Sequence, residues 1–146
     1  MLRLRPHHIL DIVRNIGNDR PRVPHPYGHL VHVVTERIIA DIDAECELVV
    51  ANDDICGPCR MFAPDGSCTD VLAQLDPPIA KQTYNDELDR RLLEFLRIES
   101  GSVMTLRAYL ELVAERIESV AKICAHPKER VEDRKRGLEK GLTMLL

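Results

Sequence analysis

The second half of the sequence is dominated by apolar residues at helical spacing. Within residues 105–124, apolar side chains recur every three or four positions, at Leu106, Leu110, Val113, Ile117, Val120 and Cys124. Residues 83–96 begin with polar capping residues and then place four apolar side chains on one face, those of Leu88, Leu92, Phe95 and Leu96. Apolar residues repeated at this period form the buried face of an α-helix. The pattern therefore predicts a mainly helical fold with an aliphatic core.

The first half of the sequence predicts two strands with helices between them. Residues 2–5, LRLR, alternate apolar and basic side chains as a short strand does. Residues 7–16 and 29–44 carry helical patterns, and residues 45–51, ECELVVA, predict a second strand. Two strands joined through helices can lie parallel in one sheet, because the helical crossover brings the chain back to the same edge.

The end of the chain predicts one more helix. Pro127 fits the first turn of this helix, and Gly137 and Gly141 are expected to weaken it. A chain of 146 residues is long enough to bury the core of one domain. We therefore expect an α+β fold: a mainly helical single domain over residues 1–146, with about five helices, a small two-stranded sheet and a cysteine-rich loop at residues 53–68.

Charge and composition argue against several classes of partner. The formal net charge is −4 and the isoelectric point is near 5.9, whereas nucleic acids and anionic membranes need a basic surface. No run of apolar residues approaches the roughly 18 that cross a membrane, and arginine and histidine interrupt the first ten residues before a signal peptide could form. We expect a cytoplasmic protein with no nucleic-acid or membrane partner, whose five cysteines are reduced.

Three of the five cysteines lie in the loop DDICGPCRMFAPDGSC, residues 53–68. Cys56, Cys59 and Cys68 follow the spacing C-x2-C-x8-C. Two thiolates separated by a tight turn can reach one metal ion without strain, and the Pro-Asp-Gly turn at 64–66 can bring the third thiolate back to them. The loop therefore predicts a metal site with three thiolates and one open position.

The fourth ligand has several candidates. Cys46 lies on the apolar face of the second predicted strand, so we expect it to be a buried core residue. Cys124 lies on an apolar helical stripe, where core packing is also the simpler interpretation. His7 and His8 lie four and three positions before Asp11, a spacing that places all three on one helix face but is also typical of a hydrogen-bonded helix start.

Four short motifs resemble a known family. LRLRPHHIL at 2–10, PYG at 26–28, DDICGPC at 53–59 followed by Cys68, and IC at 123–124 occur in the order seen in DUF1284, an uncharacterised bacterial and archaeal family. The likeness spans most of the chain. The resemblance implies a metal-binding protein of unknown cellular role that holds an iron–sulphur cluster, the cofactor proposed for the family.

The chain departs from the family pattern at two places. Members have HHLLC where this sequence has HHILD, so Asp11 stands in for a cysteine. Pro127 falls where the second cysteine of a C-x2-C pair would be, and no later cysteine follows. The chain keeps four of the family's cysteines, and the resemblance implies that these form one complete site: Cys56, Cys59, Cys68 and Cys124.

The identity of the metal follows from how the cysteines are grouped. Three clustered cysteines and one remote cysteine resemble the ligands of plant-type ferredoxins, whereas structural zinc sites commonly use two close pairs. We expect an iron–sulphur cluster, with Zn²⁺ as the alternative, in which His7 or His8 completes a Cys3His set. Tyr27 and Asp54 are expected to line a pocket beside the metal, together with the two histidines and Asp11.

Two classes of function stay open. One is a metalloprotein in electron transfer, sensing or catalysis, with an unknown protein or redox partner. The other is a zinc-stabilised or metal-free helical interaction module without catalytic activity, and a bare redox dithiol is a third interpretation. The sequence contains no phosphate-binding loop, nucleophile elbow or suggestive carboxylate pair. We therefore assign no catalytic residue and leave enzyme status and oligomeric state open.

Overall fold

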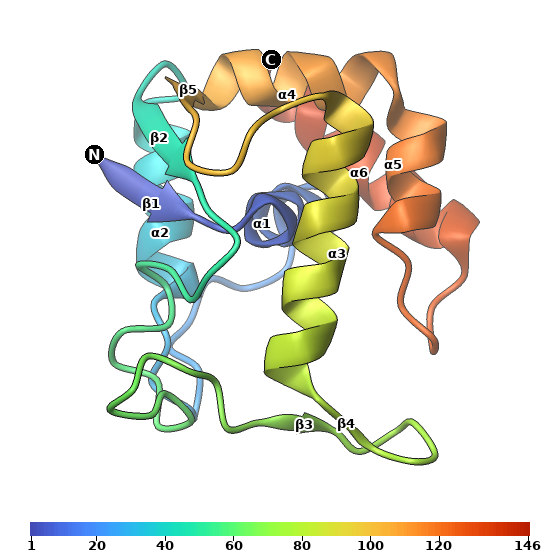
Figure 1. The fold of residues 1–146 in the computed structure, drawn as a ribbon. Helices are drawn as coiled ribbons and strands as arrows, with labels where there is room; N and C mark the ends of the chain where they lie inside the picture. Colours follow the sequence, from blue (N-terminus) through green and yellow to red (C-terminus); the bar gives the residue numbers. More distant parts are fainter.

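The computed structural model describes residues 1–146 and contains six helices and five strands (Figure 1). The helices are α1 (Pro6–Gly17), α2 (Val31–Ala40), α3 (Lys81–Leu96), α4 (Leu106–Glu115), α5 (Ile117–Ile123) and α6 (Val131–Leu145). The strands are β1 (Leu2–Leu4), β2 (Glu45–Leu48), β3 (Val71–Leu72), β4 (Ile79–Ala80) and β5 (Val103–Thr105). The predicted mainly helical α+β fold is confirmed. None of the helices has the combination of length and apolar character that a membrane crossing requires.

The main sheet contains the predicted parallel pair and one additional strand. β1 and β2 are parallel, with Leu2 opposite Cys46 and Leu4 opposite Leu48, and α1 and α2 form the crossover between them. β5 pairs antiparallel with the other edge of β2, so the sheet has the order β1-β2-β5 and three strands rather than the predicted two. A separate two-stranded hairpin, β3-β4, was also missed. Unlike LRLR at β1, the sequences of β3, β4 and β5 (VL, IA and VMT) do not alternate apolar and charged side chains.

The long apolar stripe of residues 105–124 forms two helices instead of one. α4 ends at Glu115, the φ of −129° and ψ of 32° of the next residue, Arg116, are not helical, and α5 then runs in a different direction (Figure 1). Both halves still bury their apolar faces, through Leu110 and Val113 in α4 and Val120 in α5. Periodicity reports which side chains are buried, but it does not report a change of direction at a single residue.

The last helix begins later than predicted. Pro127 lies in a loop, and α6 starts only at Val131. His126 holds the chain in a turn here, because its Nδ1 accepts a hydrogen bond from the backbone N–H of Lys128 and its carbonyl accepts one from Glu129. The predicted start of the helix at Pro127 is therefore wrong by one turn.

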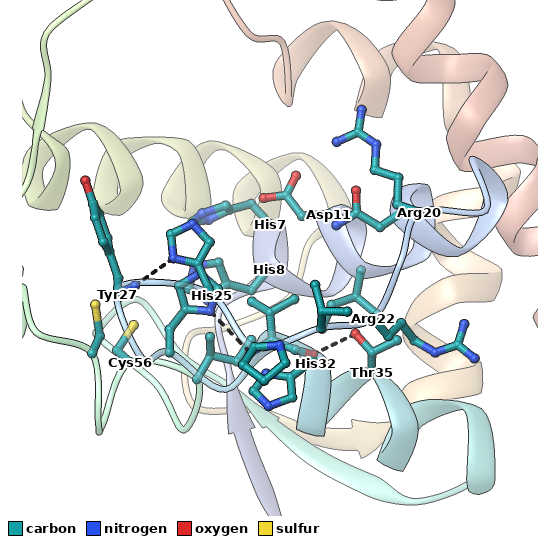
Figure 2. Close-up of a pocket in the computed structure, with 18 of the residues that line it drawn as sticks. His7, His8, Asp11, Arg20, Arg22, His25, Tyr27, His32, Thr35 and Cys56 are labelled. Atoms are coloured by element: carbon teal, nitrogen blue, oxygen red, sulfur yellow. Dashed lines mark hydrogen bonds between the residues drawn. The ribbon is translucent and has the colours of Figure 1, made fainter.

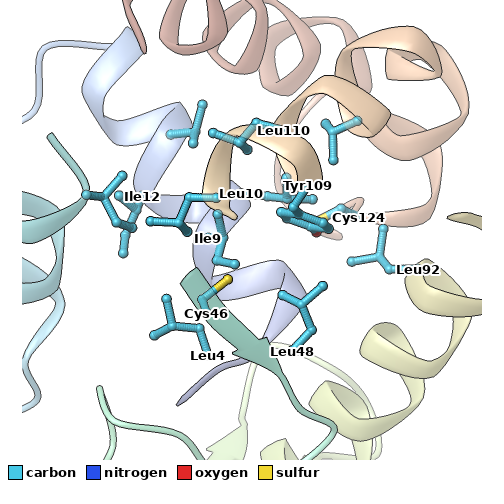
Figure 3. Packing of buried hydrophobic residues seen from close by; sticks show 14 of the residues in the cluster. Leu4, Ile9, Leu10, Ile12, Cys46, Leu48, Leu92, Tyr109, Leu110 and Cys124 are labelled. Carbon is cyan, nitrogen blue, oxygen red and sulfur yellow. The ribbon is translucent and has the colours of Figure 1, made fainter. Parts of the chain in front are cut away.

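The hydrophobic core surrounds α1, which lies between the main sheet and the C-terminal helices (Figure 1). Leu4 and Leu48 from the sheet, Ile9 from α1 and Tyr109 from α4 are all fully buried in one cluster (Figure 3). Cys46 belongs to this cluster and is also fully buried. Its predicted place in the core is confirmed.

Glycines bring α1 and α6 into backbone contact. A Cβ added at Gly141 would lie 2.0 Å from the carbonyl oxygen of Val13, and one added at Gly17 would lie 2.0 Å from the carbonyl oxygen of Gly137. No side chain fits into such a space. Gly137 and Gly141, which the sequence pattern suggested would weaken α6, are therefore the residues that allow it to pack on α1.

Gly141→Ala is expected to lower the free energy of unfolding by about 1–3 kcal/mol, as overpacking of a tight contact does. Alanine favours a helix by about 1 kcal/mol over glycine, but the clash involves backbone atoms of Val13 that cannot move without separating the helices. Chemical denaturation measures the change. Gly57→Ala is the matched control, because a Cβ there has no neighbour within 4 Å. Unchanged stability in Gly141→Ala would contradict the tight packing.

Candidate metal centre

A cavity of about 530 Å³ lies between α1, α2, the loop that joins them and the cysteine loop (Figure 2). Its lining includes five of the six histidines and three of the five cysteines of the chain: His7, His8, His25, His29, His32, Cys56, Cys59 and Cys68. Imidazole nitrogens and thiolates are the protein ligands that zinc prefers, and thiolates hold iron–sulphur clusters. The predicted placement of His7 and His8 beside the cysteine loop is confirmed, and their role as ligands stays a prediction.

Both of these histidines are held by buried aspartates. Nδ1 of His7 lies 2.8 Å from Oδ1 of Asp89, and Nδ1 of His8 lies 2.8 Å from Oδ2 of Asp53. In the neutral imidazole, a carboxylate at Nδ1 keeps the ring proton on that nitrogen and leaves the lone pair of Nε2 free. Histidines bound to metals are commonly oriented in this way.

Arg5 connects the two histidine–aspartate pairs. Its guanidinium is fully buried and donates to Asp89 at 2.8 Å and to Asp86 at 2.7 Å, while its backbone N–H donates to Asp53 at 2.8 Å. Burial alone raises the pKa of Asp89, but the hydrogen bonds and charges of His7 and Arg5 outweigh it and lower the pKa. Asp89 is therefore a carboxylate at neutral pH, although it is fully buried.

Asp53 joins His8 to the cysteine loop. Burial raises the pKa of Asp53, but the charge and hydrogen bond of His8 outweigh this effect and lower the pKa overall. Asp53 is therefore also ionised. For His8, burial lowers the pKa, but the charge and hydrogen bond of Asp53 outweigh it and the pKa is raised. Oδ1 of Asp53 accepts hydrogen bonds from the backbone N–H of Ile55 at 3.0 Å and from the thiol of Cys56 at 3.5 Å. The potential ligand atoms of His8, Asp53 and Cys56 all lie within 4.8 Å of one another.

The thiol of Cys56 is protonated in this state. Burial, with the charge of Asp53 adding to it, raises the pKa of Cys56 to about 12. A bound cation reverses this preference, since a coordinated thiol loses its proton. Binding of a metal by Cys56 must therefore release a proton. His29 differs from Cys56 in this respect, because burial and the neighbouring His25 lower its pKa to about 4 and it is already deprotonated at neutral pH.

The cysteine loop folds back as predicted. Cys59 closes a tight turn, with its N–H donating to the carbonyl of Cys56 at 2.9 Å. Gly66 has a φ of +86°, and the turn around it lets Cys68 pair with Phe62 in an antiparallel bridge. Cys56, Cys59 and Cys68 thus line one cavity.

Cys124 lies apart from these three cysteines. It is buried in the core (Figure 3). Its sulphur lies 3.7 Å from Nη2 of Arg134. It lines a second cavity of about 490 Å³, which shares His7 and Asp11 with the first. Burial raises the pKa of Cys124 to about 12. The structure does not bring Cys124 into the cavity of the cysteine loop, and its role as a ligand stays a prediction.

The other predicted site residues fall in different places. Asp11 and Tyr27 line the cavity, Asp11 beside Arg14 at 3.2 Å and Tyr27 beneath the guanidinium of Arg60. Asp54 does not line it. Its side chain is at the surface and accepts a hydrogen bond from the backbone N–H of Arg3 at 2.8 Å.

Sequence reasoning missed three residues that organise the site: Arg5, Asp53 and Asp89. The two adjacent aspartates before Cys56 suggested an acidic residue beside the metal site, but the sequence analysis assigned that place to Asp54 instead of Asp53. Asp89 is 82 positions from His7 and lies on α3, where nothing in the local sequence connects it to the histidines.

Comparison with known proteins gives a family but no characterised relative. A family model described as "Protein of unknown function (DUF1284)" matches residues 27–128. No curated protein and no solved structure matches the chain. The matched residues include the cysteine loop, Asp89 and Cys124, whereas His7 and His8 precede them.

Proposed function

The chain belongs to the DUF1284 family of proteins of unknown function, and we propose from its own cavity that it is a metal-binding protein whose metal centre lies beside the cysteine loop. The observation that supports this proposal is the lining of that cavity, which gathers most of the imidazoles and thiols of the chain. Buried carboxylates hold two of the imidazoles by Nδ1. Such outer partners orient metal ligands and raise their basicity.

The proposed ligands are the thiolates of Cys56, Cys59 and Cys68 and the Nε2 atom of His8. His8 is favoured as the fourth ligand because Asp53 holds both its imidazole and the thiol of Cys56. Cys124, the fourth ligand implied by the family resemblance, lines the neighbouring cavity instead. Asp53 has both carboxylate oxygens occupied by hydrogen bonds, so we assign it a positioning role rather than a place among the ligands.

The grouping of the cysteines favours an iron–sulphur cluster over a single ion. Cys56, Cys59 and Cys68 belong to one loop and line one cavity, and clustered cysteine thiolates are the ligands of such clusters. Zn²⁺ is the alternative, and a tetrahedral zinc site with bonds of about 2.3 Å requires its sulphurs to lie about 3.8 Å apart.

Metal analysis of protein purified without oxygen tests this function. We expect iron and acid-labile sulphide, with the brown colour and visible absorption of a cluster. A colourless protein with one zinc per chain would support the metal site but show that the metal is zinc. Protein that holds neither iron nor zinc, and takes up neither on reconstitution, would overturn the proposed function.

Cysteine substitutions locate the centre. The triple variant Cys56→Ser, Cys59→Ser and Cys68→Ser is expected to lose the metal, because a serine hydroxyl is a poor substitute for a thiolate. Cys46→Ser is the matched control, since Cys46 is in the core and does not line the cavity. Its metal content should equal that of the wild type, and metal retained by the triple variant would place the centre elsewhere.

A further inference from the structure

The cavity beside the cysteine loop and the second cavity meet between α1 and α3. The wall that they share includes His7 and Asp11 of α1 and Lys81 and Asn85 of α3. Asn85 lies one helical turn before Asp89, whose carboxylate holds the imidazole of His7. Residues four positions apart lie on the same face of a helix, so Asn85 and His7 are neighbours at this junction. Each cavity has the size of a small-molecule site.

The side-chain amide of Asn85 has no hydrogen-bond partner in the protein, although the residue is only 8% exposed. The unpaired side-chain atoms that are sealed off from solvent all belong to other residues, so the amide of Asn85 is open to the cavities that it lines. Buried polar groups in folded proteins are nearly always hydrogen-bonded. An amide offers both donors and an acceptor, so this one points to a ligand that carries both as well.

His7 adds a hydrogen-bond acceptor to the same wall. Its Nδ1 lies 2.8 Å from the carboxylate of Asp89, so the neutral imidazole keeps its proton on Nδ1 and has a lone pair on Nε2. The side chain is only 7% exposed, and Nε2 has no partner in the protein but is not sealed off from the cavities. His8 rather than His7 completes the proposed metal ligands, so Nε2 of His7 is left for another molecule.

The charged residues of the junction neutralise one another. Asp11 pairs with Arg14 at 3.2 Å, and Asp70 pairs with Lys81 at 3.4 Å. All four residues line both cavities. The shared wall therefore carries no excess charge that would attract an ion, and it favours a neutral polar ligand.

We propose that the junction of the two cavities binds a small neutral molecule that carries a primary amide group. One N–H of this amide donates to Nε2 of His7 and the other donates to Oδ1 of Asn85, while its carbonyl accepts from Nδ2 of Asn85. The apolar part of the molecule extends into the second cavity, where Leu72 and Leu88 form part of the wall. The site uses none of the proposed metal-ligand atoms, so it goes beyond the proposed function and does not depend on it.

Isothermal titration calorimetry of the full chain with three matched probes tests the proposal. Benzamide is a primary amide, N,N-dimethylbenzamide keeps only the acceptor, and benzoate replaces the amide with a charged carboxylate. We expect saturable binding of benzamide and at least about tenfold weaker binding of the other two, which leave the acceptors of His7 and Asn85 unpaired. Benzamide that does not bind saturably, or three probes that bind alike, would overturn the site. Metal content is measured on the same samples, so failure here is separable from failure of the metal proposal.

A substitution in α3 places the binding at the junction. Asn85→Leu removes the amide with little change in volume and is expected to weaken benzamide binding about tenfold, as loss of two neutral hydrogen bonds does. Thr83→Val is the matched control, because Thr83 lies two positions earlier on α3, is exposed and lines neither cavity. Unchanged affinity in Asn85→Leu, or an equal loss in Thr83→Val, would contradict the site, and circular dichroism verifies that each variant is folded.

Discussion

Arg5→Met is expected to lower the free energy of unfolding by about 3–5 kcal/mol, the cost of removing one partner from a buried ion pair. The methionine fills much of the same space, but it leaves the carboxylate of Asp89 buried without its cation. Asp86 loses the same partner. Desolvation of a charge that has lost its ion pair outweighs the gain from burying an apolar side chain. Chemical denaturation at neutral pH measures this loss.

Arg3→Met is the matched control for this substitution. Arg3 lies two positions earlier on β1 and forms an ion pair with Glu47 at 3.0 Å, but its side chain is 51% exposed. Exposed ion pairs contribute about 1 kcal/mol or less, because water and salt screen them. A loss in Arg5→Met no larger than that in Arg3→Met would show that the buried network contributes little to stability.

The network around Arg5 explains how the fold assembles the site. β1 and β2 are parallel neighbours, so their carboxyl ends meet at the same edge of the sheet. The Arg5–His8 segment follows β1, and the segment with Asp53 and Cys56 follows β2. Side chains that bind ligands commonly lie at the carboxyl ends of parallel strands. The site therefore combines two segments that are far apart in the sequence.

The placement of the histidines beside the cysteine loop could be predicted from the sequence. The alternation in LRLR and in ECEL identified the two strands, and helices between them implied a parallel pair. With both motifs placed directly after these strands, the histidines and the cysteine loop were expected to share a cavity, and they do. Local patterns were sufficient because each residue's position followed from its own strand.

The positions of Asp89, Cys124 and β5 could not be predicted, because they depend on contacts between residues that are far apart in the sequence. Asp89 contacts His7 from a helix whose own pattern indicates only a buried face, and its acidic side chain gives no sign of burial. Cys124 continues an apolar stripe, which favours a core residue, and only the family resemblance implied a metal ligand. β5 owes its strand conformation to pairing with β2 rather than to its three residues. Tertiary contacts of this kind override local propensity.

Asp53→Asn is expected to weaken metal binding about 10–100-fold, the usual effect of losing an outer partner of a metal ligand. The amide can still accept a hydrogen bond from His8, but it removes the negative charge that makes the imidazole a stronger ligand. At Cys56 the substitution acts in the opposite direction, because it removes a charge that raises the pKa of the thiol, so the expected loss arises at His8. The measurement is the chelator concentration that removes half of the metal from folded protein.

Asp54→Asn is the matched control, because Asp54 is the adjacent aspartate and does not line the cavity. Its metal should be as resistant to the chelator as that of the wild type.

His8→Gln and Cys124→Ser then distinguish the two candidates for the fourth ligand. We expect His8→Gln to lose metal as readily as Cys56→Ser, and Cys124→Ser to retain it at a cost in packing, since Cys124 is a core residue. The reverse result would show that Cys124 is the fourth ligand and that metal binding brings it to the cysteine loop past His7, which lines both cavities.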